Sequence, residues 1–441
     1  MLNLFEETPV GSADSSPVDS FARPVDMAWR DWAIFLLHSA AEVEHALMVQ
    51  YLFAGYSLRP QELHGLPHQT NEWAKSILMI ARQEMGHLMT VQNLLRLIGG
   101  PLCLERQDFP LRTGLYPFAF KLERFSKNSL AKYLFAEMSA GPIQEALLPA
   151  VERLEIEVRA KTAVDHDEGG GSFINHVGTL YSTLADIFSS RLTAAEFRLD
   201  RGPWQTSGWP GTVPNPGSGS KVFLLPVSDR ETAIVAIGQI AEQGEASSSQ
   251  DSHFRQLLKI YRMCPDDTET LTYPVADNPT AFADETGSSL ITNSQSALWA
   301  RLFSLRYRIL LSTLQHGASI PATLLHNGIP VANLLRVWVF EEMRAHIPGS
   351  LGNLAQARMI SMPVGDAATP VCGPVFDLPY TWAFPDLGPD RWRLHRDLVT
   401  ATGELITALR PLVEDTSDLD AIEERDAIRL TLITELGESE L

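Results

Sequence analysis

Apolar residues recur along this chain with the period of an α-helix. From Pro24 to Ser57 they include Ile34, Leu37, Ala41 and Met48, a spacing close to the 3.6 residues that place side chains on one helix face. The pattern predicts a first helix over 24–58 and a second over about 72–98. Asn71 is a suitable N-cap for the second helix, and Gly99-Gly100-Pro101 would end it.

Further helical patterns follow, separated by proline-containing and glycine-containing segments. They predict helices over 129–139, 149–168, 173–190, 229–243, 253–263, 290–316, 331–346 and 390–412, and at most a helical pair over 414–441. The short stretch 221–227 is the one strand candidate. The fold class predicted from these patterns is all-α.

The same patterns suggest how the chain is organised. Residues 1–24 are polar and rich in Ser, Pro and Asp, so we expect a flexible N-terminal tail and not a signal peptide. A bundle is predicted over 25–265, with a long proline-rich and glycine-rich loop at 199–220. After a polar connector that contains prolines, a C-terminal helical region is predicted over 287–441.

Composition and charge narrow the function classes. The chain has 441 residues, 45% of them hydrophobic, and 35 Lys and Arg against 54 Asp and Glu, a formal net charge of −19. Such an acidic balance argues against nucleic-acid and anionic-membrane partners, and no apolar run approaches the roughly 20 residues of a membrane helix. Three widely separated cysteines suggest neither a disulfide framework nor a cysteine zinc site. We therefore expect a cytoplasmic protein.

Isolated acidic residues on apolar helices are the main chemical signal. Four-helix carboxylate metal sites combine single glutamates on two helices with a Glu-x-x-His pair on each of the other two, because residues three apart share a helix face. Here the candidates occur in a comparable order along successive helices: Glu44, Glu84 with His87, Glu137, and then Glu242 and Glu245 with His253. Oxygen-rich ligand sets with some nitrogen favour iron or manganese over zinc.

Other assignments of the same residues stay open from the sequence. Glu42 and His45 have the same spacing as Glu84 and His87 and would be the inward pair if the first helix were rotated. Glu137 would be a surface residue if its helix face is misassigned. Independently, His253 would be a histidine that follows an N-cap at Ser252, with no metal nearby.

Two further polar groups have simpler interpretations. Glu341, Glu342 and His346 include a Glu-x-x-x-His spacing suited to a second metal site, but a solvated helix end is the favoured interpretation. His38 lies about one helical turn before Glu42. It is interpreted as a hydrogen-bonded residue beside the site or in the core, and not as a metal ligand.

At these residues the sequence resembles the ferritin-like domain of the iminophenyl-pyruvate dimer synthase family, enzymes of bis-indole biosynthesis that join two tryptophan-derived imines. The matching stretches are Glu42-Val-Glu-His-Ala46 with Tyr51-Leu-Phe-Ala54, Gln83-Glu-Met-Gly-His87 through Asn93-Leu-Leu95 to Ile98-Gly-Gly-Pro101, Phe135-Ala-Glu-Met138, Ile240-Ala-Glu-Gln-Gly-Glu245 with Ser252-His-Phe254, and Gly373-Pro-Val-Phe-Asp-Leu-Pro379. They spread over most of residues 26–380.

The resemblance implies a ferritin-like four-helix bundle with an additional C-terminal helical region. It also implies a set of metal ligands, with Glu242 as the alternate for Glu245: Glu44, Glu84, His87, Glu137, Glu245 and His253. The chain departs from the family pattern at Ala246 and Gln83, and an insert separates His253 from Glu245, so the second metal site is the weaker expectation. We do not expect the large additional region of the dimer synthases in this chain.

The function expected from residues and resemblance together is a non-haem di-iron oxidoreductase. It would act with dioxygen on a small, amino-acid-derived substrate of secondary metabolism, with Tyr51 and Gln83 adjusting the site. Manganese or haem are the alternative cofactors, and a homodimer is the expected assembly. The competing functions are a non-catalytic metal-binding protein and a metal-free ferritin-like subunit of a biosynthetic complex.

Overall fold

The structure is a computed structural model that describes residues 22–60, 69–110, 120–137, 177–197, 224–245, 252–282, 287–321, 323–380 and 383–439. Several predictions concern residues outside these ranges: most of the N-terminal tail, the helix over 149–168 and the loop at 199–220. The side chain of Glu245 also lies outside the described residues. Within them the fold is all-α, as the sequence predicts.

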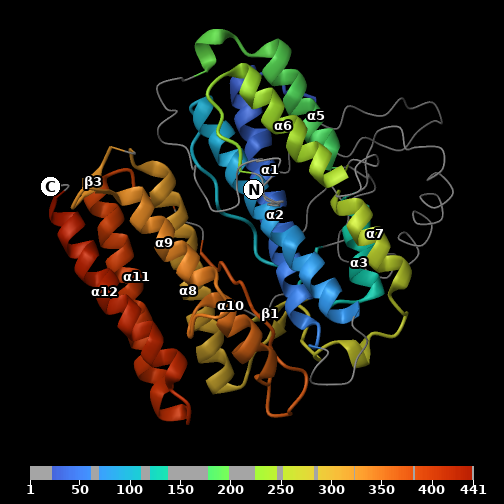
Figure 1. Ribbon diagram of the computed structural model, residues 1–441, viewed down its shortest axis with the longest axis vertical. Helices are drawn as coiled ribbons and strands as arrows, with labels where there is room; N and C mark the ends of the chain where they lie inside the picture. Colours follow the sequence, from blue (N-terminus) through green and yellow to red (C-terminus); the bar gives the residue numbers. More distant parts are fainter. Residues whose placement is uncertain are drawn as a thin grey trace.

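Two long helices form the centre of the N-terminal half (Figure 1). Helix α1 (Trp29–Ser57) and helix α2 (Gln69–Leu97) run antiparallel. The Arg30 Nε near the start of α1 donates a hydrogen bond of 2.8 Å to the Ile98 carbonyl just after α2. Both helices bury most of their length, so polar residues on their inner faces are removed from water. Helix α2 begins two residues before Asn71, and the prediction that Asn71 caps it is therefore wrong.

The other side of the bundle consists of shorter helices in two pairs. Helix α5 (Val177–Asp186), continued by a π-helical turn (Ile187–Arg191) and a 3₁₀ turn (Ala194–Glu196), packs against α6 (Arg230–Glu245). Helix α3 (Lys127–Ala136) packs against α7 (His253–Met263). Figure 1 shows the α5–α6 pair near one end of α1 and α2 and the α3–α7 pair nearer the other.

Side-chain caps fix where α3 and α7 begin. Ser126 and Ser129 form a reciprocal capping box at the start of α3, and the Ser252 hydroxyl accepts a hydrogen bond from the Arg255 backbone N–H at the start of α7. Such caps satisfy N–H groups that the first helical turn leaves without partners. They therefore determine the positions of the residues that follow, including His253.

The C-terminal region is a second group of helices, drawn in gold to red in Figure 1. Its elements are α8 (Ser294–Ser319), α9 (Val331–Met343), α10 (Leu351–Asn353) followed by a π-helical turn (Leu354–Arg358) and a 3₁₀ turn (Met359–Ser361), α11 (Gly388–Leu409) with a 3₁₀ turn (Arg410–Leu412), and α12 (Ser417–Ser439). The segment predicted as a helical pair at most is thus one continuous helix, α12.

Strands are minor in the described residues. Strand β1 (Pro279–Thr280), which follows a 3₁₀ turn (Glu269–Leu271), pairs parallel with β2 (Ser289–Leu290), and β3 (Leu325–His326) pairs antiparallel with β4 (Ile329–Pro330). Residues 224–227 of the predicted strand are not in a strand. One hydrophobic core extends from α1 to Ile422 of α12. Among the described helices, none combines the length and apolar character needed to cross a membrane.

A buried ion network joins α8, α9 and α12. Arg306 on α8 contacts Glu342 on α9 and also donates a hydrogen bond of 2.6 Å to Asp426 on α12. Arg429 on α12 lies 2.6 Å from the same Glu342 carboxylate. Glu342 is 1% exposed, so the interpretation of residues 341–346 as a solvated helix end is wrong for this residue. Burial alone would raise its pKa, but the guanidiniums of Arg306 and Arg429 hold the pKa of Glu342 at about 2.

This network predicts a specific loss of stability. Replacing Glu342 by Gln leaves two buried guanidiniums with too little negative charge, and we expect a loss of about 3 kcal/mol in the free energy of unfolding. Glu341→Gln is the matched control, because the Glu341 carboxylate is half-exposed and lies at the edge of the network, 3.3 Å from an Nη of Arg429. We expect about 1 kcal/mol or less for this control. Urea unfolding of both variants beside the parent measures the difference, and equal losses would contradict the prediction.

Candidate metal centre

Five acidic and imidazole side chains converge inside the bundle, although they come from four helices. Helix α1 contributes Glu44, α2 contributes Glu84 and His87, the residue that ends α3 is Glu137, and α7 begins with His253. All five are at most 3% exposed. Three carboxylates buried together are costly unless protons, hydrogen bonds or cations compensate their charge. We call these five residues the carboxylate cluster.

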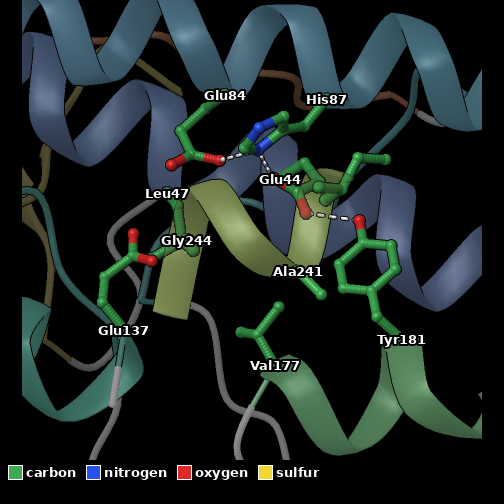
Figure 2. A pocket seen from close by; sticks show the side chains of 10 residues that line it. Glu44, Leu47, Glu84, His87, Glu137, Val177, Tyr181, Ala241 and Gly244 are labelled. Carbon is green, nitrogen blue, oxygen red and sulfur yellow. Dashed lines mark hydrogen bonds and ion pairs between the residues drawn. The ribbon is translucent and has the colours of Figure 1, made fainter. Parts of the chain in front are cut away.

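One half of the carboxylate cluster consists of Glu44, Glu84 and His87. The His87 Nδ1 lies 3.1 Å from Glu84 Oε2 and 3.4 Å from Glu44 Oε2. Figure 2 shows both carboxylates directed toward the imidazole ring. Glu84 and His87 are three residues apart on α2, so their side chains project from the same helix face.

The other half consists of Glu84 again, with Glu137 and His253. The His253 Nδ1 lies 2.6 Å from Glu84 Oε1 and 3.6 Å from Glu137 Oε1. The two imidazole rings are stacked with their centroids 5.5 Å apart. Glu84 therefore turns one oxygen toward each histidine and belongs to both halves. In each half the ligand-type atoms lie within 4.8 Å of one another, as binding to one metal ion requires.

Two buried atoms in the second half lack the hydrogen bonds expected of them. Glu84 Oε1 and His253 Nδ1 lie 2.6 Å apart, but neither has a hydrogen-bond partner of acceptable geometry among the described residues. Buried polar atoms are almost always satisfied, and a carboxylate oxygen and an imidazole nitrogen this close without a well-formed hydrogen bond are placed as two ligands of one cation would be. The donor set and this deficit both fit a metal ion.

Glutamine side chains determine which histidine nitrogens face the carboxylates. The Nε2 of His87 donates a hydrogen bond of 2.9 Å to Gln243, and the Nε2 of His253 donates one of 3.2 Å to Gln83. A proton on Nε2 leaves the lone pair of the neutral ring on Nδ1, which is the atom that faces the carboxylates in both residues. Both imidazoles are thus oriented as metal ligands would be.

Two tyrosines hold the outer carboxylates in a similar way. The Tyr51 hydroxyl donates a hydrogen bond of 2.5 Å to Glu137 Oε1, and the Tyr181 hydroxyl of α5 donates one to Glu44 Oε1. Figure 2 shows the Tyr181 contact. Each half of the carboxylate cluster therefore has one carboxylate anchored by a phenol, while Glu84 lies between them.

The pKa values show how strongly these groups interact. Burial, and then the charge of Glu84, raise the pKa of Glu44 to about 8. The pKa of Glu84 is lowered, because its attraction to His253 and His87 outweighs the effect of burial. Burial would lower the pKa of His253, but Glu84 and Glu137 raise it to about 9. Without a metal ion, the carboxylate cluster therefore retains protons that a bound cation would displace.

The space around the carboxylate cluster is small. A cavity of about 10 Å³ lies among its carboxylates, Val177 and Ile240, enough for roughly one water molecule. The backbone of α6 approaches closely at Gly244, where a Cβ atom would lie 3.3 Å from Glu137 Oε2. Among the described residues, little free space therefore remains beside the cluster.

Several residues considered from the sequence lie elsewhere. Glu242 faces away from the cluster and is exposed, since Gln243 and Gly244 occupy the inner face of α6. Glu42 accepts a hydrogen bond from the Gln107 backbone N–H, and His45 contacts the Tyr307 hydroxyl. The rotated alternative for the first helix is therefore not adopted, and the structure does not bring Glu242 to the metal centre.

Sequence reasoning missed Tyr181 and Gln243. Tyr181 lies four residues after Val177 on the apolar face of the amphipathic segment. A tyrosine on a buried face usually needs a hydrogen-bond partner for its hydroxyl, and this was the signal in the sequence. Gln243 lies between Glu242 and Glu245, the two candidate ligands of its helix. Only the orientation of α6 in the structure shows that Gln243 faces His87.

Comparisons with known proteins find similarity to ferritin-like proteins. The sequence model described as ferritin-like matches residues 37–262. Dichlorochromopyrrolate synthase of Lentzea aerocolonigenes is 25% identical over 389 residues, 79% of this chain and 36% of the relative. The 2-imino-3-(indol-3-yl)propanoate dimerase of Chromobacterium violaceum is 24% identical over 260 residues, 51% of this chain and 22% of the relative. These relatives confirm the resemblance to imine-dimerising, bis-indole enzymes.

The chain spans about a third or less of the length of these curated relatives. A crystal structure of a ferritin-like protein from Caulobacter vibrioides covers 73% of this chain and 96% of its own, with 16% identity and a TM-score of 0.44.

Proposed function

The chain belongs to the ferritin-like family, and we propose that it is an oxygen-using enzyme whose carboxylate cluster holds a pair of iron ions. The observation that carries this proposal is Glu84, whose two oxygens face separate groups of buried ligand atoms. One ion would bind Glu44, Glu84 and His87, and the other Glu84, Glu137 and His253. This arrangement resembles the bundle sites in which carboxylates from several helices surround two metals.

The donor set favours iron or manganese among the common metals. Carboxylate oxygens with one imidazole for each ion suit these metals better than zinc or calcium. Haem at this position would require space for a porphyrin, whereas the cavity among the cluster residues measures about 10 Å³. Glu245 stays a candidate ligand from the sequence, because its side chain is outside the described residues.

When bound, the iron pair would supply electrons to dioxygen. The chain's own groups would keep the ligands in place and exclude water. Tyr51 holds Glu137, Gln83 holds His253, and the apolar Val177 and Ile240 line the cavity. Tyr51 and Gln83 are accordingly the residues proposed to adjust the reactivity of the site through its ligands.

The substrate is proposed to be small and derived from an amino acid. The support is the similarity to two enzymes, one of which is a 2-imino-3-(indol-3-yl)propanoate dimerase, over half or more of this chain. Since the chain spans only a minor share of each relative, their complete reaction is not transferred to it.

A second candidate is a metal-binding subunit that serves a partner enzyme. The small volume of the cavity favours it, because the described residues leave about 10 Å³ beside the carboxylate cluster, too little for an organic substrate. Metal content alone does not separate the two functions, whereas dioxygen consumption does.

The shared position of Glu84 predicts an unequal effect of two single substitutions. Loading with Fe²⁺ under anaerobic conditions, desalting and elemental analysis should give about two ions per parent chain. Glu137→Gln removes a ligand from one half and should leave about one ion, whereas Glu84→Gln should leave close to none. Glu242→Gln is the control on exposed α6 surface and should match the parent. Well under one ion in the parent chain would refute the proposal.

The Tyr181 hydrogen bond predicts a weaker effect on affinity. Tyr181→Phe frees the Glu44 carboxylate to reorient, and we expect the Fe²⁺ affinity to fall about tenfold, the usual scale for a residue that orients a ligand. Tyr133→Phe is the control, because among the described residues its buried hydroxyl bonds only the Gln50 carbonyl, at 3.3 Å. Competition with a coloured Fe²⁺ chelator measures both, and equal affinities in the two variants would contradict the assigned role.

Dioxygen consumption separates the enzyme from the metal-binding subunit. The iron-loaded parent should consume dioxygen rapidly in an oxygen electrode, and Glu84→Gln loaded in the same way should consume it no faster than free Fe²⁺ at equal concentration. A parent chain that holds two ions yet shows only the rate of free Fe²⁺ would favour the subunit function.

A further inference from the structure

A second and larger cavity lies between the bundle and the C-terminal region. It has a volume of about 490 Å³, within the range of small-molecule sites. Its walls come from α1, the end of α2 and the segment 100–105 on one side, and from the end of α8, the segment 383–386 and the start of α11 on the other. We call this cavity the inter-region cleft.

The inter-region cleft is separated from the carboxylate cluster by α1. His38 lines the cleft, and its Nε2 donates a hydrogen bond of 3.2 Å to the Pro101 carbonyl. His38 and His45 are seven residues apart and so share a face of α1, whereas Glu44 projects from another face into the cluster. The cleft is thus a site of its own.

Two guanidiniums and two carboxylates line the inter-region cleft. Arg96, which is 8% exposed, and Arg391 both line it. Of the two acidic lining residues, Glu105 is already paired with Arg308, and Asp386 is exposed. The charge of Glu105 is thus compensated by a residue outside the lining, and the two guanidiniums of the lining favour an anionic ligand.

The guanidinium of Arg391 is held in position by the chain itself. Its Nε donates a hydrogen bond of 2.7 Å to the Pro385 carbonyl, and one Nη donates a bond of 2.8 Å to the Asp386 carbonyl. A guanidinium fixed along one edge loses little entropy on binding a carboxylate. The arrangement is therefore preorganised for an anion.

An aromatic ring lies beside this cation. The Arg391 guanidinium is centred 5.6 Å from the Phe384 ring, and the ring packs against buried His316 at 5.9 Å. Leu102 and Leu104 add apolar surface to the opposite wall. Apolar walls with a few converging polar groups are typical of sites for small organic molecules.

We propose that the inter-region cleft binds a small organic anion, a carboxylate carried on an apolar body. The carboxylate pairs with the guanidiniums of Arg96 and Arg391, and the apolar body lies against Phe384 and Leu104. This ligand site is distinct from the metal centre and does not depend on the function proposed for it.

Calorimetric titration with 3-phenylpropionate tests the proposal on the full chain. We expect the neutral analogue 3-phenylpropanamide to bind about tenfold more weakly, and Arg391→Gln to weaken phenylpropionate binding about tenfold, since each removes a charge-assisted contact. Arg393→Gln is the matched control on the same helix, because Arg393 is exposed and pairs with Asp390 at the surface. It should bind as the parent does.

A second variant tests the cleft without altering its charge. Ser319 is the last residue of α8 and lines the cleft, so Ser319→Trp should fill the space and abolish binding. Titrations of metal-free and iron-loaded protein should agree, which separates this site from the metal centre. The proposal is overturned if phenylpropionate fails to bind at millimolar concentration, if the amide binds equally well, or if a folded Arg391→Gln or Ser319→Trp variant binds like the parent.

Discussion

The burial of one shared carboxylate organises this molecule. Glu84 is 2% exposed and lies between two imidazoles, with further carboxylates beyond each of them. A bundle that buries so many ionisable groups needs compensation at that point, and the chain provides imidazoles, phenol hydroxyls and amides around it. The short helices opposite α1 and α2 place two further members of the cluster beside Glu84. Glu137 is available because α3 ends there, and His253 because α7 begins there.

Much of this arrangement could be predicted from the sequence, because helical periodicity fixes which residues share a face. Glu84 and His87 are three apart on one helix, and their convergence follows from local geometry alone. Glu137 and His253 were identified by their order along the chain, and the structure places both near Glu84. Glu242 could not be assigned in this way. Its side of α6 depends on how the helix packs against α2 and α5, which no local pattern determines.

The C-terminal region shows a different limit. Glu342 resembles a solvated residue when only its own helix is considered, because it lies beside Glu341 at the end of that helix. Its two partners, Arg306 and Arg429, lie 36 and 87 residues away and meet it only after α8, α9 and α12 have packed together. Burial of a charge by distant partners is a tertiary effect, and the spacing of residues along one helix contains no information about it.

Helix α1 connects these two regions, because its faces serve different purposes. Glu44 faces the carboxylate cluster, while Glu42 and His45 contact Gln107 and Tyr307 on the side of the C-terminal region. Tyr307 in turn packs edge-on against Phe376, which belongs to the late segment shared with the dimer synthase family. A shift of α1 that moved Glu44 would therefore disturb buried polar contacts on its other face. The C-terminal helices thus limit the movement of a residue of the carboxylate cluster, which gives a physical reason for the bundle to be joined to them.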